Sequence, residues 1–327
     1  MPVIVRARAA SVLFAAVVVV LLSWLPRPAM ACASCGCSLS SNAAMGYTSR
    51  PGWVLSLQYD YIDQNQLRHG TGSASTPPVG QEFEKQTLNQ YITAGLTYAP
   101  DSKWNLRLLL PYVIRDHTTY GTYSPPSPLV ASDSHSSSIG DAKLIANYQG
   151  FLPTRNLGVQ FGVKLPTGAY GNAVNFSSGP LAGTPLDASL QPGTGSTDLI
   201  LGGYYYRAIS QNYDAFGELS YQSAVATRDD YRPGDKTTLT AGLRYEAHPK
   251  WTPQLQLNIA YKRSDTGLNG DPANTAGMLV YLSPGITAAV AKKSQLYGFL
   301  QVPVYWNLDG YQLMPEWTAS LGWIYRF

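Results

Sequence analysis

The end of the chain alternates strictly between apolar and polar side chains. Counting back by twos from the last residue gives only apolar side chains: Phe327, Tyr325, Trp323, Leu321, Ala319 and Trp317. The positions between them carry Arg326, Ile324, Gly322, Ser320, Thr318 and Glu316, of which Ile324 alone is a large apolar residue. Because successive side chains of a β-strand point to opposite faces, this segment predicts a strand with one oily and one wet face. Large aromatic rings on the oily face favour a strand that faces lipid.

Eleven further segments upstream are predicted to be strands of about 9–11 residues, the length that a tilted strand needs to cross a bilayer. Long and short connections alternate between them, as external loops and periplasmic turns do in outer-membrane barrels. A soluble two-sheet sandwich has no reason for this alternation. The expected strands are 53–62, 87–98, 104–114, 140–148, 157–165, 197–206, 213–222, 237–246, 253–261, 277–287 and 295–305, followed by the terminal segment.

The fold class expected is therefore all-β: a single transmembrane antiparallel β-barrel of about twelve strands over residues 53–327, following a cleaved signal peptide. Composition agrees, since charged residues make up only 13% of the chain, against roughly 25% in ordinary soluble domains. An even strand count would place both ends of the barrel on the periplasmic side.

The N-terminus has the features of an export signal. Arg6 and Arg8 precede an apolar run at 11–25, and Ala29-Met30-Ala31 follows. This order predicts a secretory signal peptide at 1–31 with an A-x-A cleavage site; a retained membrane anchor is the alternative. Cleavage would remove three of the 23 basic residues and none of the 20 acidic ones. The mature chain is then formally neutral, which gives no indication of nucleic-acid binding.

All three cysteines, Cys32, Cys35 and Cys37, follow the predicted cleavage site. We expect residues 32–52 to form a small plug or periplasmic tether. Thiolates at this spacing can hold a soft ion such as Cu(I) or Zn(II), and no other cofactor is expected. The alternatives are a redox-active or plain disulfide with one thiol left over, or a lipid anchor on Cys32. Haem attachment is disfavoured because Gly36, not a histidine, follows Cys35.

Charged residues at inward phase along the strands are the candidates for a pore lining. The lumen of a barrel is wet enough to hold charges that lipid would exclude. These residues either pair to fill a narrow barrel or form a constriction that selects solutes by charge and hydrogen bonding, and both can hold at once. The candidates are Arg107, Asp141, Lys143, Lys164, Asp198, Glu218, Arg244 and Glu316.

Short motifs at strand ends carry a family resemblance. They include Ile139-Gly140-Asp141-Ala142, the segment 162–168, the segment 191–198 and Leu282-Ser283-Pro284-Gly285. Over residues 50–327 the chain resembles the outer-membrane family labelled for the meta-pathway of phenol degradation. That resemblance implies a transporter-like barrel that passes small, often aromatic or hydrophobic, solutes. The terminal strand resembles the C-terminal signal of outer-membrane barrels, which implies that Trp323, Tyr325 and Phe327 are read by the barrel-assembly machinery.

The function expected is passive diffusion of small solutes through the outer membrane of a Gram-negative bacterium, with outer-membrane lipid, the assembly machinery and the solute as partners. One alternative is a non-conducting barrel whose cysteine segment binds metal or acts in redox chemistry. Another is an outer-membrane hydrolase using a Ser–His pair. Since none of the four histidines lies in a G-x-S-x-G-type motif, we expect no enzymatic activity.

Overall fold

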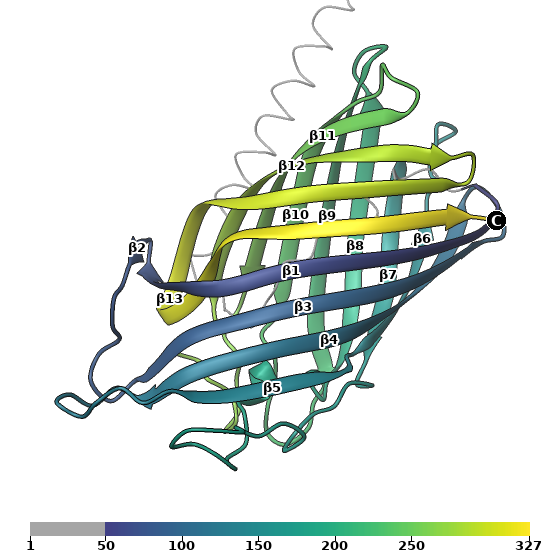
Figure 1. The fold of residues 1–327 in the computed structure, drawn as a ribbon. Coiled ribbons are helices and arrows are strands. Elements are labelled where there is room, and N and C mark those ends of the chain that lie inside the picture. The colour runs from purple at the N-terminus through teal and green to yellow at the C-terminus, as the bar shows by residue number, and fades with distance from the viewer. Residues whose placement is uncertain (1–49) are drawn as a thin grey trace, which may run out of the picture.

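The computed structural model describes residues 50–327, and these residues form a β-barrel (Figure 1). The predicted signal peptide, most of the predicted plug or tether, and Cys32, Cys35 and Cys37 lie outside the described residues. One 3-10 turn, η1 (Ala188–Leu190), lies in the connection before β8. The strands are β1 (Gly52–Gly70), β2 (Gly72–Ser73), β3 (Glu82–Ala99), β4 (Trp104–Thr122), β5 (Ser132–Ile139), β6 (Ala142–Tyr148), β7 (Leu157–Leu165), β8 (Thr197–Ala208), β9 (Tyr213–Ala226), β10 (Lys236–Tyr245), β11 (Trp251–Lys262), β12 (Gly277–Ala291) and β13 (Ser294–Arg326).

The sheet closes on itself. Except for β2 and β5, neighbouring strands pair antiparallel in chain order from β1 to β13, and β13 pairs with β1 to complete the ring. The short β2 pairs with β1, and β5 pairs with the outer part of β4. At this seam Val54 lies opposite Arg326, and the amide of Phe327 donates to the carbonyl of Trp53 at 2.9 Å. Figure 1 shows β1 and β13 side by side, with the C-terminus beside the start of β1. Closure leaves no open sheet edge at the seam, as a lipid environment requires.

The last element, β13, crosses the barrel twice. Its residues 294–308 pair with β12, and its residues 308–326 pair with β1. The chain reverses at Asp309-Gly310, where Gly310 has a φ of 58° in the left-handed region that glycine tolerates. In this described part of the chain, eleven strand elements therefore enclose the lumen, and the two halves of β13 correspond to the last two predicted strands.

The two faces of the wall have opposite character. On β4 the even-numbered side chains Leu106, Leu108 and Leu110 are exposed, while Arg107 and Val113 are buried. Aromatic pairs lie where strands meet the short turns: Trp53 with Tyr98, and Trp104 with Tyr148, each with 4.6 Å between ring centroids. Such rings at one end of an apolar band are typical of the aromatic girdle at a membrane interface.

At the end of the barrel opposite these short turns, some strands extend further than the sequence predicts. We expected a loop across residues 115–138, and this prediction was wrong, because β4 continues to Thr122 and pairs there with β5. In β5, Ser132, Ser134 and Ser136 are buried while Asp133 and His135 are exposed. The segment has period two but no apolar face, so a search for lipid-facing strands misses it. The extension indicates a rim that rises beyond the apolar band.

No helix within residues 50–327 is both long enough and apolar enough to span a membrane.

Candidate channel lumen and vestibule

A cavity of about 210 Å³ lies inside the ring and is lined by the inward faces of most strands. Its charged lining residues are Arg107 on β4, Lys143 on β6, Lys236 on β10 and Glu218 on β9. Glu218 accepts a hydrogen bond from Gln160 Nε2 at 3.1 Å. The rest of the lining combines aliphatic side chains, such as Leu109, Ile145 and Ile200, with amide and hydroxyl groups. The cavity is smaller than the roughly 300–1,000 Å³ of sites for drug-sized ligands, so it fits only small solutes.

Lys164 connects two carboxylates above this cavity. Its Nζ lies 3.3 Å from Asp141 Oδ2 and 3.0 Å from Asp198 Oδ2, and the three side chains are almost fully buried. It also donates to Ser196 Oγ at 2.9 Å and to Thr194 Oγ1. Asp141 accepts from the Thr194 amide at 2.9 Å. The cluster therefore connects β6, β7 and β8 with the end of the long connection 166–196.

The two ends of the 166–196 connection touch at a pair of glycines. A Cβ on Gly168 would lie 2.7 Å from Gly193 Cα, and a Cβ on Gly193 would lie 2.7 Å from the Gly168 carbonyl carbon. The Gly193 amide also donates to the Ala169 carbonyl at 2.7 Å. No side chain fits between these backbones, which explains why both family-like motifs, 162–168 and 191–198, contain glycine at this place.

The 166–196 connection folds inward and packs a small core of its own. Val174, Phe176, Leu186 and Leu190 are buried together. Arg115 on β4 donates from Nη1 to the carbonyls of Leu190 and Gln191, the latter at 3.3 Å, and from Nη2 to the Tyr91 hydroxyl at 3.0 Å. Connections of this kind that carry their own packing are often functional. Here the connection is held against the inner wall by Arg115 and lines the vestibule at the barrel mouth.

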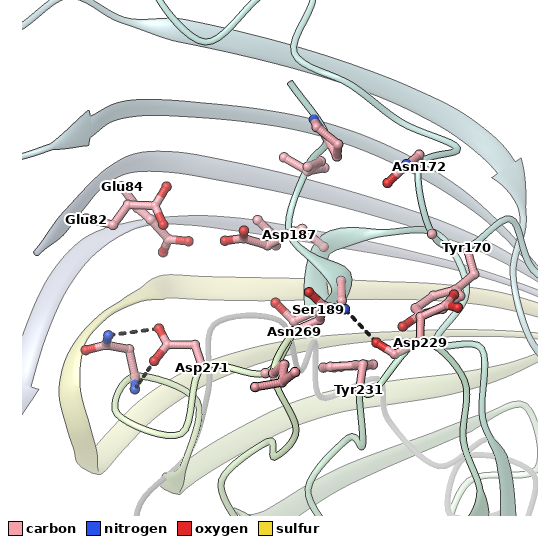
Figure 2. A pocket seen from close by; sticks show the side chains of 18 of the residues that line it. Glu82, Glu84, Tyr170, Asn172, Asp187, Ser189, Asp229, Tyr231, Asn269 and Asp271 are labelled. Carbon is pink, nitrogen blue, oxygen red and sulfur yellow. Dashed lines mark hydrogen bonds between the residues drawn. The ribbon is translucent and has the colours of Figure 1, made fainter. Parts of the chain in front are cut away.

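A larger cavity of about 750 Å³, the vestibule, lies on the rim side of this connection. Figure 2 shows Glu82, Glu84 and Asp187 directed toward one another on one side of it, with Asp271 nearby. Asp229 lies on the opposite side with Tyr170 and Tyr231 (Figure 2). The residues that line the vestibule include no lysine or arginine.

Burial and neighbouring negative charges raise the pKa values of three vestibule carboxyls, those of Glu82, Glu84 and Asp187. Glu82 and Glu84 lie at the outer end of β3, beyond the exposed apolar side chains Ile92 and Leu96 that mark its membrane-spanning part. Burial, and then the charge of Asp187, raises the pKa of Glu82 to about 7. Burial, and then the charge of Glu82, raises the pKa of Glu84 to about 8. The pKa of Asp187 is raised by burial and by Asp271.

The predicted lumen residues fall into three places. Arg107, Lys143 and Glu218 line the inner cavity, and Asp141, Lys164 and Asp198 form the cluster above it. Arg244 pairs with Glu246 at 2.7 Å at the turn end of β10, away from both cavities.

Glu316 does not share the lumen phase that the alternation predicts for it. It is exposed and lines neither of these two cavities, and the β1–β13 register shifts beside it, where Gln64 pairs with Pro315 and Ile62 with Thr318. An extra residue in one strand breaks the period of two, which simple alternation cannot foresee.

Two charged residues of the site were not predicted. Arg115 directly follows the expected strand 104–114 at the inward phase of Arg107, so a longer strand would have included it. Lys236 directly precedes the expected strand 237–246, and the structure begins β10 with it.

The described residues contain no group of three or more His, Cys, Asp or Glu side chains placed to hold a metal ion. The proposed soft-metal ligands Cys32, Cys35 and Cys37 are outside this range and stay a prediction.

Comparison with known proteins gives a family match and structural neighbours. A sequence model of the family described as "Putative MetA-pathway of phenol degradation" matches residues 70–321. An outer membrane channel from Pseudomonas putida F1 superposes with a TM-score of 0.61 at 14% identity, covering 86% of this chain and 98% of that one. The toluene transporter TbuX of Ralstonia pickettii has a TM-score of 0.45 at 12% identity, covering 85% and 90%. No curated protein sequence matches the chain.

Proposed function

Because the chain belongs to the family described as "Putative MetA-pathway of phenol degradation", we propose that it is a passive outer-membrane channel for small hydrophobic or aromatic solutes. The observation that carries this proposal is the closed ring itself, apolar outside and enclosing a charged and polar cavity. Only such a closed barrel satisfies every backbone group of a β-sheet in lipid. The P. putida neighbour, an outer membrane channel, has the same fold.

The orientation follows from the two ends of the barrel. Short turns, such as those at 100–103 and 209–212, lie at the end that carries the aromatic pairs, and the long connections lie at the other end. In outer-membrane barrels the short turns are periplasmic. The vestibule is then the external entrance, and solutes pass the folded 166–196 connection to reach the inner cavity.

Export and insertion are part of the proposal. The signal peptide at 1–31 would bring the chain to the periplasm of a Gram-negative bacterium, and Trp323, Tyr325 and Phe327 would be read by the assembly machinery. These three rings form a row, with 6.0 Å between the first two centroids and 5.1 Å between the last two. We expect no enzymatic activity of a barrel whose interior serves as a conduit.

The test is flux through the purified barrel in liposomes and planar bilayers. Ile145→Trp adds a bulky ring on the cavity side of β6, and we expect it to reduce conductance and solute-driven swelling by more than about half. Leu144→Trp, on the lipid side of the same strand, is the matched control and should leave both unchanged. A wild-type barrel that passes neither ions nor small solutes would contradict the channel and favour the non-conducting alternative.

A further inference from the structure

The inner cavity carries more positive than negative charge. Arg107, Lys143 and Lys236 face it, against the single carboxylate of Glu218. Lys164 and its two aspartates lie above the cavity, and the three side chains together carry a net charge of −1. Within the cavity lining, the excess of cationic groups favours an anionic occupant.

Lys143 is the side chain best placed to hold that occupant. Within residues 50–327 its ammonium group makes no hydrogen bond and no ion pair, although it faces the cavity. Its cross-strand neighbour is Lys164, whose charge is already engaged by Asp141 and Asp198. The charges of Lys236 and Lys164 act on it from one side of the balance and those of Asp198 and Asp141 from the other, without direct contact to either aspartate. An ammonium group that faces a cavity and makes no direct ion pair is favoured to bind an anion there.

An apolar wall lies next to this ammonium group. Leu109 is paired with Lys143 across β4 and β6, and Ile145 follows on the same face of β6. Ile200 on β8 approaches Ile145 because Gly162 lies between them: a Cβ there would be 2.9 Å from Ile145 and 3.3 Å from Ile200. The cavity therefore presents an aliphatic surface and a cation to the same small volume.

We propose that the inner cavity is a binding subsite for a small organic carboxylate with an apolar body, such as a monocyclic aromatic acid. The carboxylate pairs with the ammonium group of Lys143, and the ring lies against Leu109, Ile145 and Ile200. An inorganic anion would leave the aliphatic surface unused, and a neutral hydrocarbon would leave the ammonium group uncompensated. This subsite rests on the proposed channel function and names its solute class.

Binding to the purified full-length barrel in detergent tests the subsite without requiring conduction. Isothermal titration with benzoate should give saturable binding to the wild type. Lys143→Met keeps the side-chain length and removes the charge, so we expect benzoate affinity to fall by about tenfold, which corresponds to about 1.4 kcal/mol. Lys143→Arg should stay within about threefold of the wild type, because the cation is retained.

Three controls test whether the effect depends on the position of the lysine, on the charge of the ligand and on a folded barrel. Lys103→Met removes an exposed lysine from the turn between β3 and β4 and should bind benzoate as the wild type does. Benzamide, the neutral analogue, should bind the wild type and Lys143→Met equally. Heat-modifiable electrophoretic mobility reports that each variant is a folded barrel, and a misfolded Lys143→Met would be replaced by Lys143→Gln.

Two results would overturn the subsite: no benzoate binding to the wild type at millimolar concentration, or equal affinity in Lys143→Met. Failure of the channel is a separate result, because a barrel that binds benzoate through Lys143 yet carries no current keeps the subsite and contradicts the conduit. Conversely, a conducting barrel whose benzoate binding ignores Lys143 keeps the channel and loses the subsite.

Discussion

Lys164 lies between two carboxylates that would repel each other without it. Asp141 and Asp198 are nearly as buried as the lysine, and each also accepts hydrogen bonds, from Thr194 and Gln222 respectively. Removing one partner from a buried ion cluster costs more than the cluster contributes as a whole, because the remaining charges stay buried and uncompensated.

Replacement of this lysine should therefore destabilise the barrel. For Lys164→Met we expect the free energy of unfolding to fall by about 3–5 kcal/mol, measured by urea titration of the barrel refolded in lipid vesicles. The triple variant Lys164→Met, Asp141→Asn, Asp198→Asn removes all three charges and should recover most of that loss. If the single and triple variants have the same free energy of unfolding, uncompensated charge is not what destabilises Lys164→Met.

Single residues also show where sequence reasoning stops. Inward phase was enough to place Asp141, Lys164 and Asp198 on one wall, since they lie within or beside strands of regular alternation. The same reasoning failed at Glu316, where a bulge changes the phase. Nor could it show that Lys164 binds both aspartates while Lys143 binds neither, because this depends on how neighbouring strands are staggered.

At the scale of elements, strand existence was more predictable than strand length. The structure has β7 at the expected 157–165, because its ends coincide with the apolar band. β1, by contrast, continues to Gly70 through polar residues, and β5 consists largely of serine. These segments are stabilised by backbone pairing with taller neighbours and by the inward-folded 166–196 connection, neither of which leaves an apolar pattern.

The vestibule formed by the outer ends of these elements should respond to pH. A raised carboxyl pKa means that the folded state holds the proton more tightly than the unfolded chain, whose Glu side chains titrate near 4.5. Glu82 and Glu84 thus keep their protons in the folded state up to about pH 7 and about pH 8, and the free energy of unfolding decreases as the pH rises from about 4.5 to about 8. Asp187, Asp229 and Asp271 face the same space.

The preference of the current for cations should therefore increase between about pH 6 and pH 9. Reversal potentials across a salt gradient in planar bilayers measure it. The double variant Glu82→Gln, Glu84→Gln should flatten the dependence, whereas Asp63→Asn, a carboxylate of β1 outside the cavity lining, should not. A wild-type reversal potential that is constant over this range would show that the vestibule carboxyls do not face the ion path.

The whole molecule is a ring sealed by its first and last strands. The β1–β13 pairing runs from Val54 opposite Arg326 to Gly70 opposite Leu308, with three shifts of register. Because closure involves β1, β13 and the hydrogen bond from Phe327 to Trp53, the termini of the barrel lie next to each other. The twelve expected strands already implied that both ends lie on one side, since an even number of crossings returns the chain to the side where it began, and the β1–β13 pairing makes the two ends neighbours.

A circularly permuted chain tests what that adjacency means. Joining Phe327 to Gly52 through a short flexible linker and opening the turn at 209–212 keeps every strand pairing of the ring. We expect this permutant to refold in detergent into a heat-modifiable barrel, yet to fail to reach the outer membrane in cells, because Trp323, Tyr325 and Phe327 are no longer at its end. Failure to refold in detergent would mean that closure itself depends on free ends.

Because the β1–β13 seam closes the ring, the order of the strands and the position of the chain's ends become two separate properties. In the folded barrel the strands have a cyclic order, and no pairing marks one of them as the first. On the proposal that the assembly machinery reads the aromatic C-terminal strand, the place of the chain's end matters during insertion. A barrel of this kind could therefore acquire new termini at any periplasmic turn, provided that an aromatic ending is rebuilt there.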